Sequence, residues 1–140
     1  MPEDIGPAAG KIRLKITCPV SVIADMEVDS VQIPAMVGAR LIISKQAPLI
    51  CALNAGRLMA CSDGKEPITY LISKGICEVR RDICAVMAWG IRSDQIDEKL
   101  YRRLLADAEG LLPLLVSGSA RRELQNRVEF YQLVLGTFRK

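Results

Sequence analysis

Three arginines near the C-terminus, Arg121, Arg122 and Arg127, are the side chains best suited to recognition chemistry in this sequence. A guanidinium presents a planar fork of N–H donors that fits carboxylates and phosphates. Residues 119–140 carry five cations and two anions, and this excess of three equals the net charge of the whole chain, +3. At the start of an expected helix, positive charge opposes the macrodipole by about 0.3–1 kcal/mol per residue. The arginines therefore either dock on an acidic partner or pair with glutamates of a solvated face.

Residue types that carry catalysis are scarce. The sequence has no histidine, which removes the commonest general base and metal ligand. It has no Gly-x-x-x-x-Gly-Lys phosphate loop and no paired carboxylates at an active-site spacing. Ser73 and Lys74 are adjacent on an expected hairpin turn, which is no evidence for a nucleophile and its base. We therefore expect no enzyme, no catalytic residues and no cofactor.

The cysteines are scattered along the chain at Cys18, Cys51, Cys61, Cys77 and Cys84. An odd number without any Cys-x-x-Cys pair fits neither a disulfide framework nor a zinc site. We interpret them as small buried hydrophobic residues of a reducing compartment and expect no metal site.

The spacing of apolar residues changes between Trp89 and Glu98. Before this stretch they recur at strand spacing or in short runs, and after it they recur at helical spacing. Ser93 and Asp94 can accept hydrogen bonds at a helix start, and Asp94, Asp97 and Glu98 place negative charge in its first turn. The chain is therefore expected to be a β module with a helical appendage.

Before Trp89 the pattern predicts about eight to ten short strands. The expected strands include residues 11–18, 20–26, 27–33, 37–43, 49–53, 57–61, 68–72, 76–80 and 83–88. The alternation slips at Asp29 and Ser30, as at a β-bulge, and the apolar run 41–43 suggests a strand buried on both faces. Asp63-Gly64 is the sharpest hairpin signal. Because no helix separates the strands, we expect an antiparallel sandwich or barrel.

After Ser93 two apolar stripes predict an antiparallel two-helix hairpin. One comprises Ile96, Leu100, Leu104, Ala108 and Leu111, widened by Tyr101 and Leu105, and the other comprises Ala120, Leu124, Val128, Tyr131 and Leu135. Ser117-Gly118-Ser119 form a polar break with an N-cap candidate, and Gly136 is placed to end the second helix.

The expected organisation has three parts, and the fold class is mainly β plus α. Residues 1–10 form a flexible N-terminal arm, residues 11–92 a β-sandwich and residues 93–140 an α-helical hairpin. No apolar run reaches the ~18 residues of a membrane span, and no signal peptide is evident. We therefore expect a soluble, cytoplasmic protein without direct membrane insertion.

Three motifs, in order along the chain, resemble the epsilon subunit of bacterial F-type ATP synthases. Residues 38–49 keep Gly38, Ile42 and the Ala47-Pro48-Leu49 end of the family's Gly-rich segment. Residues 70–79, Tyr-Leu-Ile-Ser-Lys-Gly-Ile-Cys-Glu-Val, are similar to the family's Tyr-Leu-Ser-Gly-Gly-Ile-Leu-Glu-Val signature. Ile96-Asp97 stands where the family has Leu- or Ile-Asp at the start of its hairpin.

The resemblance implies a non-catalytic subunit of the central stalk, held peripherally at the cytoplasmic face of the cell membrane through the synthase complex. Its sandwich would dock on the gamma subunit and the ring of c subunits. Ser44, Lys45 and Gln46 replace the family's Pro-Gly-His and are expected partner contacts. The hairpin would fold against the sandwich or extend toward the alpha and beta subunits and block ATP hydrolysis. The three arginines are the expected contacts there.

Some members of the family bind ATP through an Ile/Leu-Asp-x-x-Arg-Ala motif at the hairpin. The nucleotide motif is incomplete here, because Ile96 and Asp97 are present but Leu100 stands in place of the arginine. Loss of that cation removes a partner for phosphate oxygens. We expect ATP to bind poorly or not at all, with Asp97 only a helix-start charge.

The alternative function is that of a stand-alone sandwich or barrel interaction module with a basic helical tail. An oligonucleotide-binding barrel would present aromatic side chains on its sheet for base stacking. The β region contains only Tyr70 and Trp89, so no nucleic acid partner is expected. Co-purification with rotor subunits separates the two interpretations.

Overall fold

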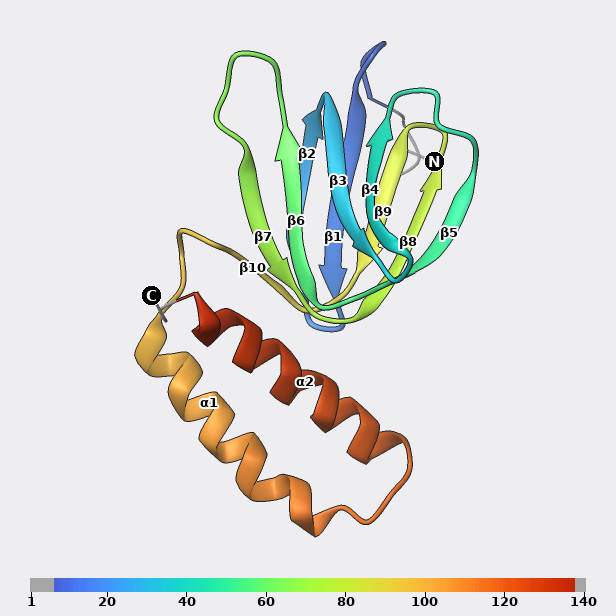
Figure 1. Cartoon of the computed structure of the whole chain (residues 1–140). Helices are drawn as coiled ribbons and strands as arrows, with labels where there is room; N and C mark the ends of the chain where they lie inside the picture. The colour runs from blue at the N-terminus through green and yellow to red at the C-terminus, as the bar shows by residue number, and fades with distance from the viewer. Residues whose placement is uncertain (1–6, 138–140) are drawn as a thin grey trace.

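Ten strands followed by two α-helices make up the chain, as the computed structural model shows for residues 7–137 (Figure 1). The strands are β1 (Ile12–Cys18), β2 (Ser21–Val28), β3 (Ser30–Ala35), β4 (Gly38–Ile43), β5 (Leu49–Leu53), β6 (Gly56–Cys61), β7 (Ile68–Ile72), β8 (Gly75–Arg80), β9 (Ile83–Met87) and β10 (Gly90–Arg92). The helices are α1 (Glu98–Leu111), the short 3-10 helix η2 (Leu112–Leu114) and α2 (Ser119–Gly136). This order confirms the predicted β domain followed by a helical hairpin.

The strands form one sheet that folds over into a sandwich. Its order is β10-β7-β6-β3-β5-β8-β9-β1-β2, and β4 pairs with β3 off this path. Among the described residues every pair is antiparallel except β1 with β9, which runs parallel. The predicted antiparallel sandwich is confirmed, and this one parallel pair departs from it. No tight turn links β1 to β9, so local sequence does not fix their relative direction.

Alternation along β1 sets the main core. Ile12, Leu14 and Ile16 are fully buried, while Arg13 and Lys15 are only partly so. The main apolar cluster is drawn entirely from residues between Ile12 and Ala88. The sandwich therefore encloses its own core without a contribution from the helices.

The slip of alternation at Asp29 and Ser30 is not a β-bulge. β2 ends at Val28 and β3 begins at Ser30, so Asp29 is where the chain leaves the side of β1 and joins the side of β6. A register irregularity does occur, but it lies earlier, between Ile16 and Thr17 of β1.

β4 is an edge strand rather than a strand buried on both faces. Ile42 is its one buried residue, whereas Leu41 and Ile43 are 59% and 51% exposed. β4 pairs with β3 alone, and nothing in residues 7–137 covers its outer side. The prediction was wrong because a solid apolar run does not distinguish a covered strand from an exposed apolar face.

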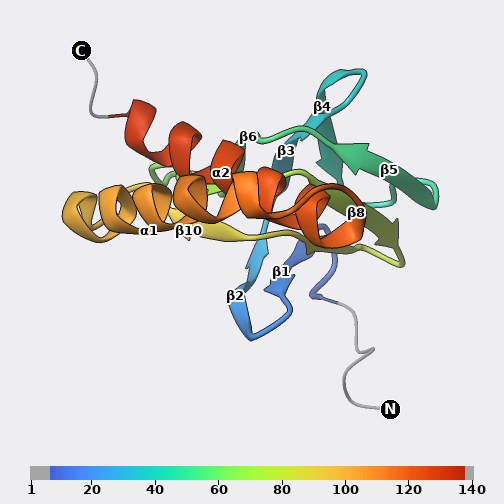
Figure 2. The ribbon, with the colours of Figure 1, turned by 90° about the horizontal axis from the view of Figure 1, so that it is seen from below.

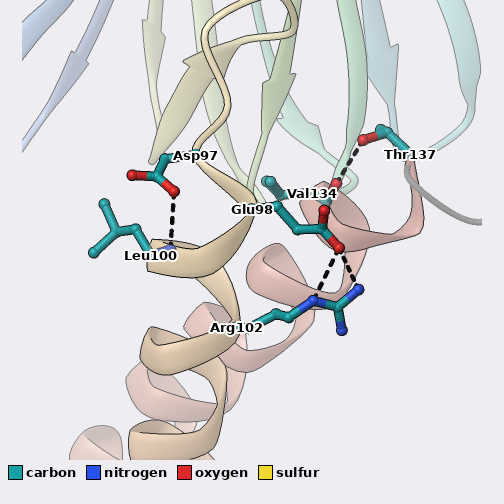
Figure 3. Close-up of polar contacts among 6 residues, drawn as sticks. All are labelled: Asp97, Glu98, Leu100, Arg102, Val134 and Thr137. Atoms are coloured by element: carbon teal, nitrogen blue, oxygen red, sulfur yellow. Dashed lines mark hydrogen bonds and ion pairs between the residues drawn. The ribbon is translucent and has the colours of Figure 1, made fainter.

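α1 begins later than the sequence suggested. Its N-cap is Asp97, whose Oδ1 accepts a hydrogen bond from the N–H of Leu100 at 3.2 Å (Figure 3). Ser93 and Asp94 instead follow β10, where Asp94 pairs with Arg92 at 2.9 Å. Ser93 and Asp94 were therefore wrong as helix caps, because the short strand β10 occupies the region of the period change.

α2 has no side-chain N-cap. The break at Ser117-Gly118-Ser119 places Gly118 at the cap position with a φ of 99°, and no side-chain capping bond forms. The predicted serine cap is thus wrong. The helix does end at Gly136, after which Oγ1 of Thr137 donates to the carbonyl of Val134 at 2.8 Å (Figure 3).

The two helices lie antiparallel beneath one end of the sandwich (Figures 1 and 2). A second apolar cluster joins them to the sheet, and it includes Leu71 of β7 with Tyr101, Phe130, Val134 and Leu135 of the helices. The hairpin is therefore folded against the sandwich in this structure.

The buried stripe of α1 agrees with the predicted one in part. Tyr101 and Ala108 are buried, whereas Leu100 and Leu111 are 42% and 53% exposed. α2 has a wider buried face than predicted and includes Phe130. The reason is that α2 packs both on α1 and on the sheet.

The predicted flexible arm is described only in part. Residues 1–6 lie outside the described residues, as do residues 138–140. Residues 8–10 form a turn in which the N–H of Lys11 donates to the carbonyl of Ala8 at 3.0 Å. The N–H of Ala8 in turn donates to Oε1 of Glu27 at 3.4 Å, which ties this turn to β2.

Candidate functional site

Ser44, Lys45 and Gln46 lie in the turn between β4 and β5, at the end of the sandwich away from the helices (Figure 1). The backbone N–H of Lys45 donates to Oδ1 of Asp82 at 2.6 Å, and Oγ of Ser44 donates to Oδ2 of the same carboxylate at 3.3 Å. Asp82 belongs to the β8–β9 turn, where Arg81 and Asp82 both have positive φ, 53° and 62°. One carboxylate therefore fixes two turns into a single surface.

Arg121 has an intramolecular partner that the sequence did not suggest. Its Nη1 donates to the carbonyl oxygens of Leu112 and Leu115 at 2.7 and 2.6 Å. Carbonyls at a helix end lack intrahelical donors and carry partial negative charge. The guanidinium thus closes the end of the preceding helical segment, which offsets its unfavourable place at the start of α2. Its role as a partner contact stays a prediction.

Arg127 lies against Trp89. Its Cζ is 4.3 Å from the centroid of the indole ring, which is cation–π geometry. Its Nε is buried and has no hydrogen-bond partner among the described residues. The indole Nε1 donates to Oε2 of Glu123, one turn earlier in α2, at 3.3 Å. These contacts hold α2 to the segment that follows β9.

Arg122 is exposed, unlike its two half-buried companions on α2. It borders a shallow pocket with Lys74 and Glu129, which form an ion pair at 3.2 Å. The structure therefore does not gather the predicted contact residues into one site. Ser44, Lys45 and Gln46 lie at the end of the sandwich opposite the hairpin that carries the arginines (Figure 1).

Ile96 and Asp97 of the nucleotide motif have structural roles (Figure 3). Asp97 caps α1, and Ile96 packs on the second apolar cluster. The nearest following arginine, Arg102, donates through Nε to Glu98 at 2.9 Å and makes a second bond to it through Nη2. The structure thus shows that Asp97 caps the start of α1. Weak ATP binding stays a prediction.

The possible metal ligands and the cysteines of the described residues bear on whether this chain can bind a metal or react through a thiol. No cluster of three or more His, Cys, Asp or Glu side chains that could hold a metal ion occurs in residues 7–137. Cys77 and Cys84 are buried with sulfurs 3.6 Å apart. Their hydrogen bond, followed by burial, raises the pKa of Cys77, which keeps this thiol protonated and unreactive. The other three cysteines are only partly buried.

Two apolar rows lie on outer faces of the sandwich. In the first, Leu41 and Met59 share the strand partner Gln32, and Ile43 extends the row along β4. In the second, Ile76 and Met87 are direct partners across β8 and β9, and both are about half exposed, 49% and 48%. In the first row the polar side chain of Gln32 lies between Leu41 and Met59, so the apolar surface is interrupted there. Exposed apolar side chains grouped in this way are candidate docking surfaces. Sequence reasoning missed both rows, because alternation does not show which faces remain uncovered.

Residues 11–93 match a family model described as the beta-sandwich domain of the ATP synthase Delta/Epsilon chain. The chain belongs to the ATP synthase delta/epsilon chain family. The match confirms the resemblance that the motifs in residues 38–49 and 70–79 suggested. No helix of this family member is long and apolar enough, within residues 7–137, to cross a membrane.

Curated relatives of this delta/epsilon family member extend the match beyond the sandwich. It is 36% identical over 124 residues to the ATP synthase epsilon chain of Dehalococcoides mccartyi, covering 81% of this chain and 88% of the relative. It is 32% identical over 108 residues to that of Trichlorobacter lovleyi, covering 76% and 78%. Among solved structures, a chain of the Euglena gracilis mitochondrial ATP synthase aligns with a TM-score of 0.63 at 18% identity, covering 95% and 84%, which supports the fold.

Proposed function

We propose that this chain is the epsilon subunit of the central stalk of an F-type ATP synthase. In this role it contributes no catalytic residue, links the gamma subunit to the ring of c subunits and restrains ATP hydrolysis through its C-terminal helices. The observation that carries the proposal is the match to an epsilon chain over 81% of this chain. That share exceeds what residues 1–92 can supply, so the match includes part of the hairpin as well as the sandwich.

The surfaces of the sandwich support docking on other subunits. The apolar row of Leu41, Ile43 and Met59 offers area that a protein partner can cover. At the end of the sandwich opposite the helices, Asp82 accepts a hydrogen bond from the backbone of Lys45 and so orders this turn. The side chain of Lys45 remains exposed to solvent. A peripheral position at the cytoplasmic face of the membrane follows if the chain is held there by its partners.

The hairpin supports a regulatory role because it adds little to the main core. The main apolar cluster ends at Ala88, so detachment of the helices leaves that core intact. In the folded-down state Arg121 and Arg127 are engaged within the chain, and Arg122 is the exposed arginine. Contact of Arg127 with acidic surface of the alpha and beta subunits therefore requires the hairpin to leave the sandwich, whereas Arg122 is already exposed in the folded-down state.

Purification of the synthase through a tag on this chain tests the assignment. We expect gamma, c, alpha and beta subunits to co-purify. Deletion of residues 116–140 should raise ATP hydrolysis by the assembled complex and leave assembly intact. Recovery of nucleic acid or of no partner would favour the stand-alone module, whereas unchanged hydrolysis after the deletion would remove the inhibitory role and keep the structural one.

Arg122→Ala is the sharper test of an electrostatic contact, because this arginine does not hold the hairpin together. A desolvated Arg–carboxylate pair contributes about 1–3 kcal/mol, and an exposed pair contributes little. We expect Arg122→Ala to raise hydrolysis by part of the effect of the deletion. If the deletion activates and Arg122→Ala does not, packing carries the inhibition.

A further inference from the structure

We propose that a small set of contacts between α2 and the rim of the sandwich forms a latch that holds the hairpin closed, and that Arg127 must leave this latch before it can meet a partner. The latch residues are Lys74 and Trp89 on the sandwich, with Glu123, Asn126, Arg127 and Glu129 on α2. The inference rests on the proposed function in one respect, namely that the hairpin opens.

The latch residues of α2 recur at three- to four-residue spacing and so share one side of the helix. Lys74, in the turn between β7 and β8, pairs with Glu129 at 3.2 Å, and its carbonyl accepts from Nδ2 of Asn126 at 3.5 Å. Trp89, between β9 and β10, contacts Glu123 at 3.3 Å and the guanidinium of Arg127 at 4.3 Å. Two neighbouring connections of the sandwich thus grip one helix.

In the closed latch, some buried polar atoms lack hydrogen-bond partners. Nε of Arg127 and Oδ1 of Asn126 are buried without hydrogen-bond partners among the described residues, and such atoms carry a desolvation cost. The side chains of Lys74 and Glu129 are 52% and 39% exposed, so their attraction is weak and screened by salt. Opening lets water reach the unpaired atoms while the contacts are lost. These opposing effects suit a contact that is reversible rather than permanent.

Arg127 can bind either Trp89 in the closed hairpin or a partner subunit in the open one, but not both at once. While its guanidinium stacks on Trp89, it cannot also pair with a carboxylate of another subunit on that face. A partner that binds Arg127 therefore selects the open hairpin, and every change that weakens the latch favours that partner by the same factor.

Trp89 is the only tryptophan of the chain, so its indole N–H gives a single, unambiguous NMR signal. Exchange of this proton with water is proportional to the open fraction when closing is fast. In the full-length protein, Glu129→Lys should place two cations together without touching Trp89. We expect the exchange rate of the Trp89 indole proton to rise about twofold to fivefold, which corresponds to the free energy that an exposed ion pair contributes. The charge swap Lys74→Glu with Glu129→Lys should restore the original rate.

Arg102→Ala is the matched control, because it breaks the ion pair with Glu98 on α1 and touches no latch residue. It should leave the exchange rate of the indole proton unchanged. An unchanged rate in Glu129→Lys, or a raised rate that the swap does not restore, would overturn the latch. If Glu129→Lys does not fold, wild-type exchange decides instead, since it must accelerate between about 0.05 and 1 M salt.

The latch and the proposed function fail in different experiments. Hydrolysis by the assembled complex is measured separately for Glu129→Lys. If indole exchange is faster in Glu129→Lys while ATP hydrolysis is unchanged, the latch is supported and the inhibitory role of the hairpin is contradicted.

Discussion

The backbone N–H of Lys45 donates a 2.6 Å hydrogen bond to Oδ1 of Asp82, a residue 37 positions later in the chain. Lys45 needs such support because its φ of 66° is unfavourable for a residue with a side chain. The expected partner-contact turn is thus held by a carboxylate that belongs to another hairpin. Its geometry depends on the packing of β8 and β9 beside β4 and β5.

Replacing Asp82 should loosen this turn. Asp82→Ala removes the acceptor of two hydrogen bonds and should lower the free energy of unfolding by about 1–3 kcal/mol. Asp82→Asn is the matched control, because asparagine keeps one acceptor oxygen and tolerates the left-handed backbone. Urea denaturation should rank the stabilities as wild type, Asn and Ala. Equal losses in both variants would show that the carboxylate does not order the turn.

Arg121 should matter to the hairpin before any partner is present. Its bonds to the carbonyls of Leu112 and Leu115 are charge-assisted, and such bonds contribute about 1.5–3 kcal/mol. Arg121→Ala should therefore speed hydrogen exchange at the turn between the helices and lower stability by about that amount. Arg122→Ala, at the neighbouring exposed position, should change stability by no more than about 0.5 kcal/mol. Equal effects of the two substitutions would refute the structural role of Arg121.

Asp29 should make stability depend on pH. Its carboxylate accepts from Nζ of Lys11 at 2.6 Å and from the N–H of Asp63 at 2.7 Å. The bond from Lys11 is the first cause that holds the pKa of Asp29 below its usual value. A depressed pKa in the folded state stabilises the protein above the unfolded-state pKa of about 3.9, and this stabilisation is lost as the pH falls through the folded-state value.

Asp29→Asn should accordingly reduce stability at pH 7 and flatten the acid limb of the stability curve. Urea midpoints at about pH 7 and pH 3 measure both effects. Asp107→Asn, at an exposed position of α1, is the control and should leave the curve close to that of the wild type. A curve for Asp29→Asn that parallels the wild type would show that Asp29 does not carry this dependence.

Local patterns predicted the parts of the fold that depend on local geometry. Ile12, Leu14 and Ile16 alternate in the sequence and are fully buried. Asp63-Gly64 was the sharpest hairpin signal, and Gly64 has the positive φ, 75°, that a tight turn needs. In each case the residues involved are close in sequence, so the periodicity of a strand or the steric demand of a turn is enough to decide.

The errors arose where distant contacts decide. Leu41 and Ile43 look like core but lie on an edge strand, because nothing in the described chain covers β4. Arg121 looked like a residue in conflict with its helix, and its compensation came from carbonyls of the preceding segment. Asp82 carries no pattern that links it to Lys45. Such contacts depend on how elements meet in space, which the spacing of residues along the chain does not encode.

The exposed apolar row on β4 should be where the gamma subunit docks. Leu41 and Ile43 are more than half exposed on the uncovered edge strand, and Met59 lies across β3 from Leu41, with Gln32 between them. Covering a large aliphatic side chain contributes about 1.5–3 kcal/mol, and about 1.4 kcal/mol corresponds to a tenfold change in affinity. Leu41→Glu with Ile43→Glu should therefore weaken binding to the gamma subunit at least tenfold, measured by calorimetry with purified subunits.

The fold should survive this pair of substitutions, since both side chains already face solvent, and the urea midpoint should stay near that of the wild type. Val116→Glu, at a 92% exposed position between the two helices, is the matched control and should bind the gamma subunit normally. The second row provides the decisive comparison. If Ile76→Glu with Met87→Glu abolishes binding while the β4 pair binds at wild-type strength, the docking face is that of β8 and β9. The exposure of Leu41 and Ile43 would then have to serve another contact in the complex.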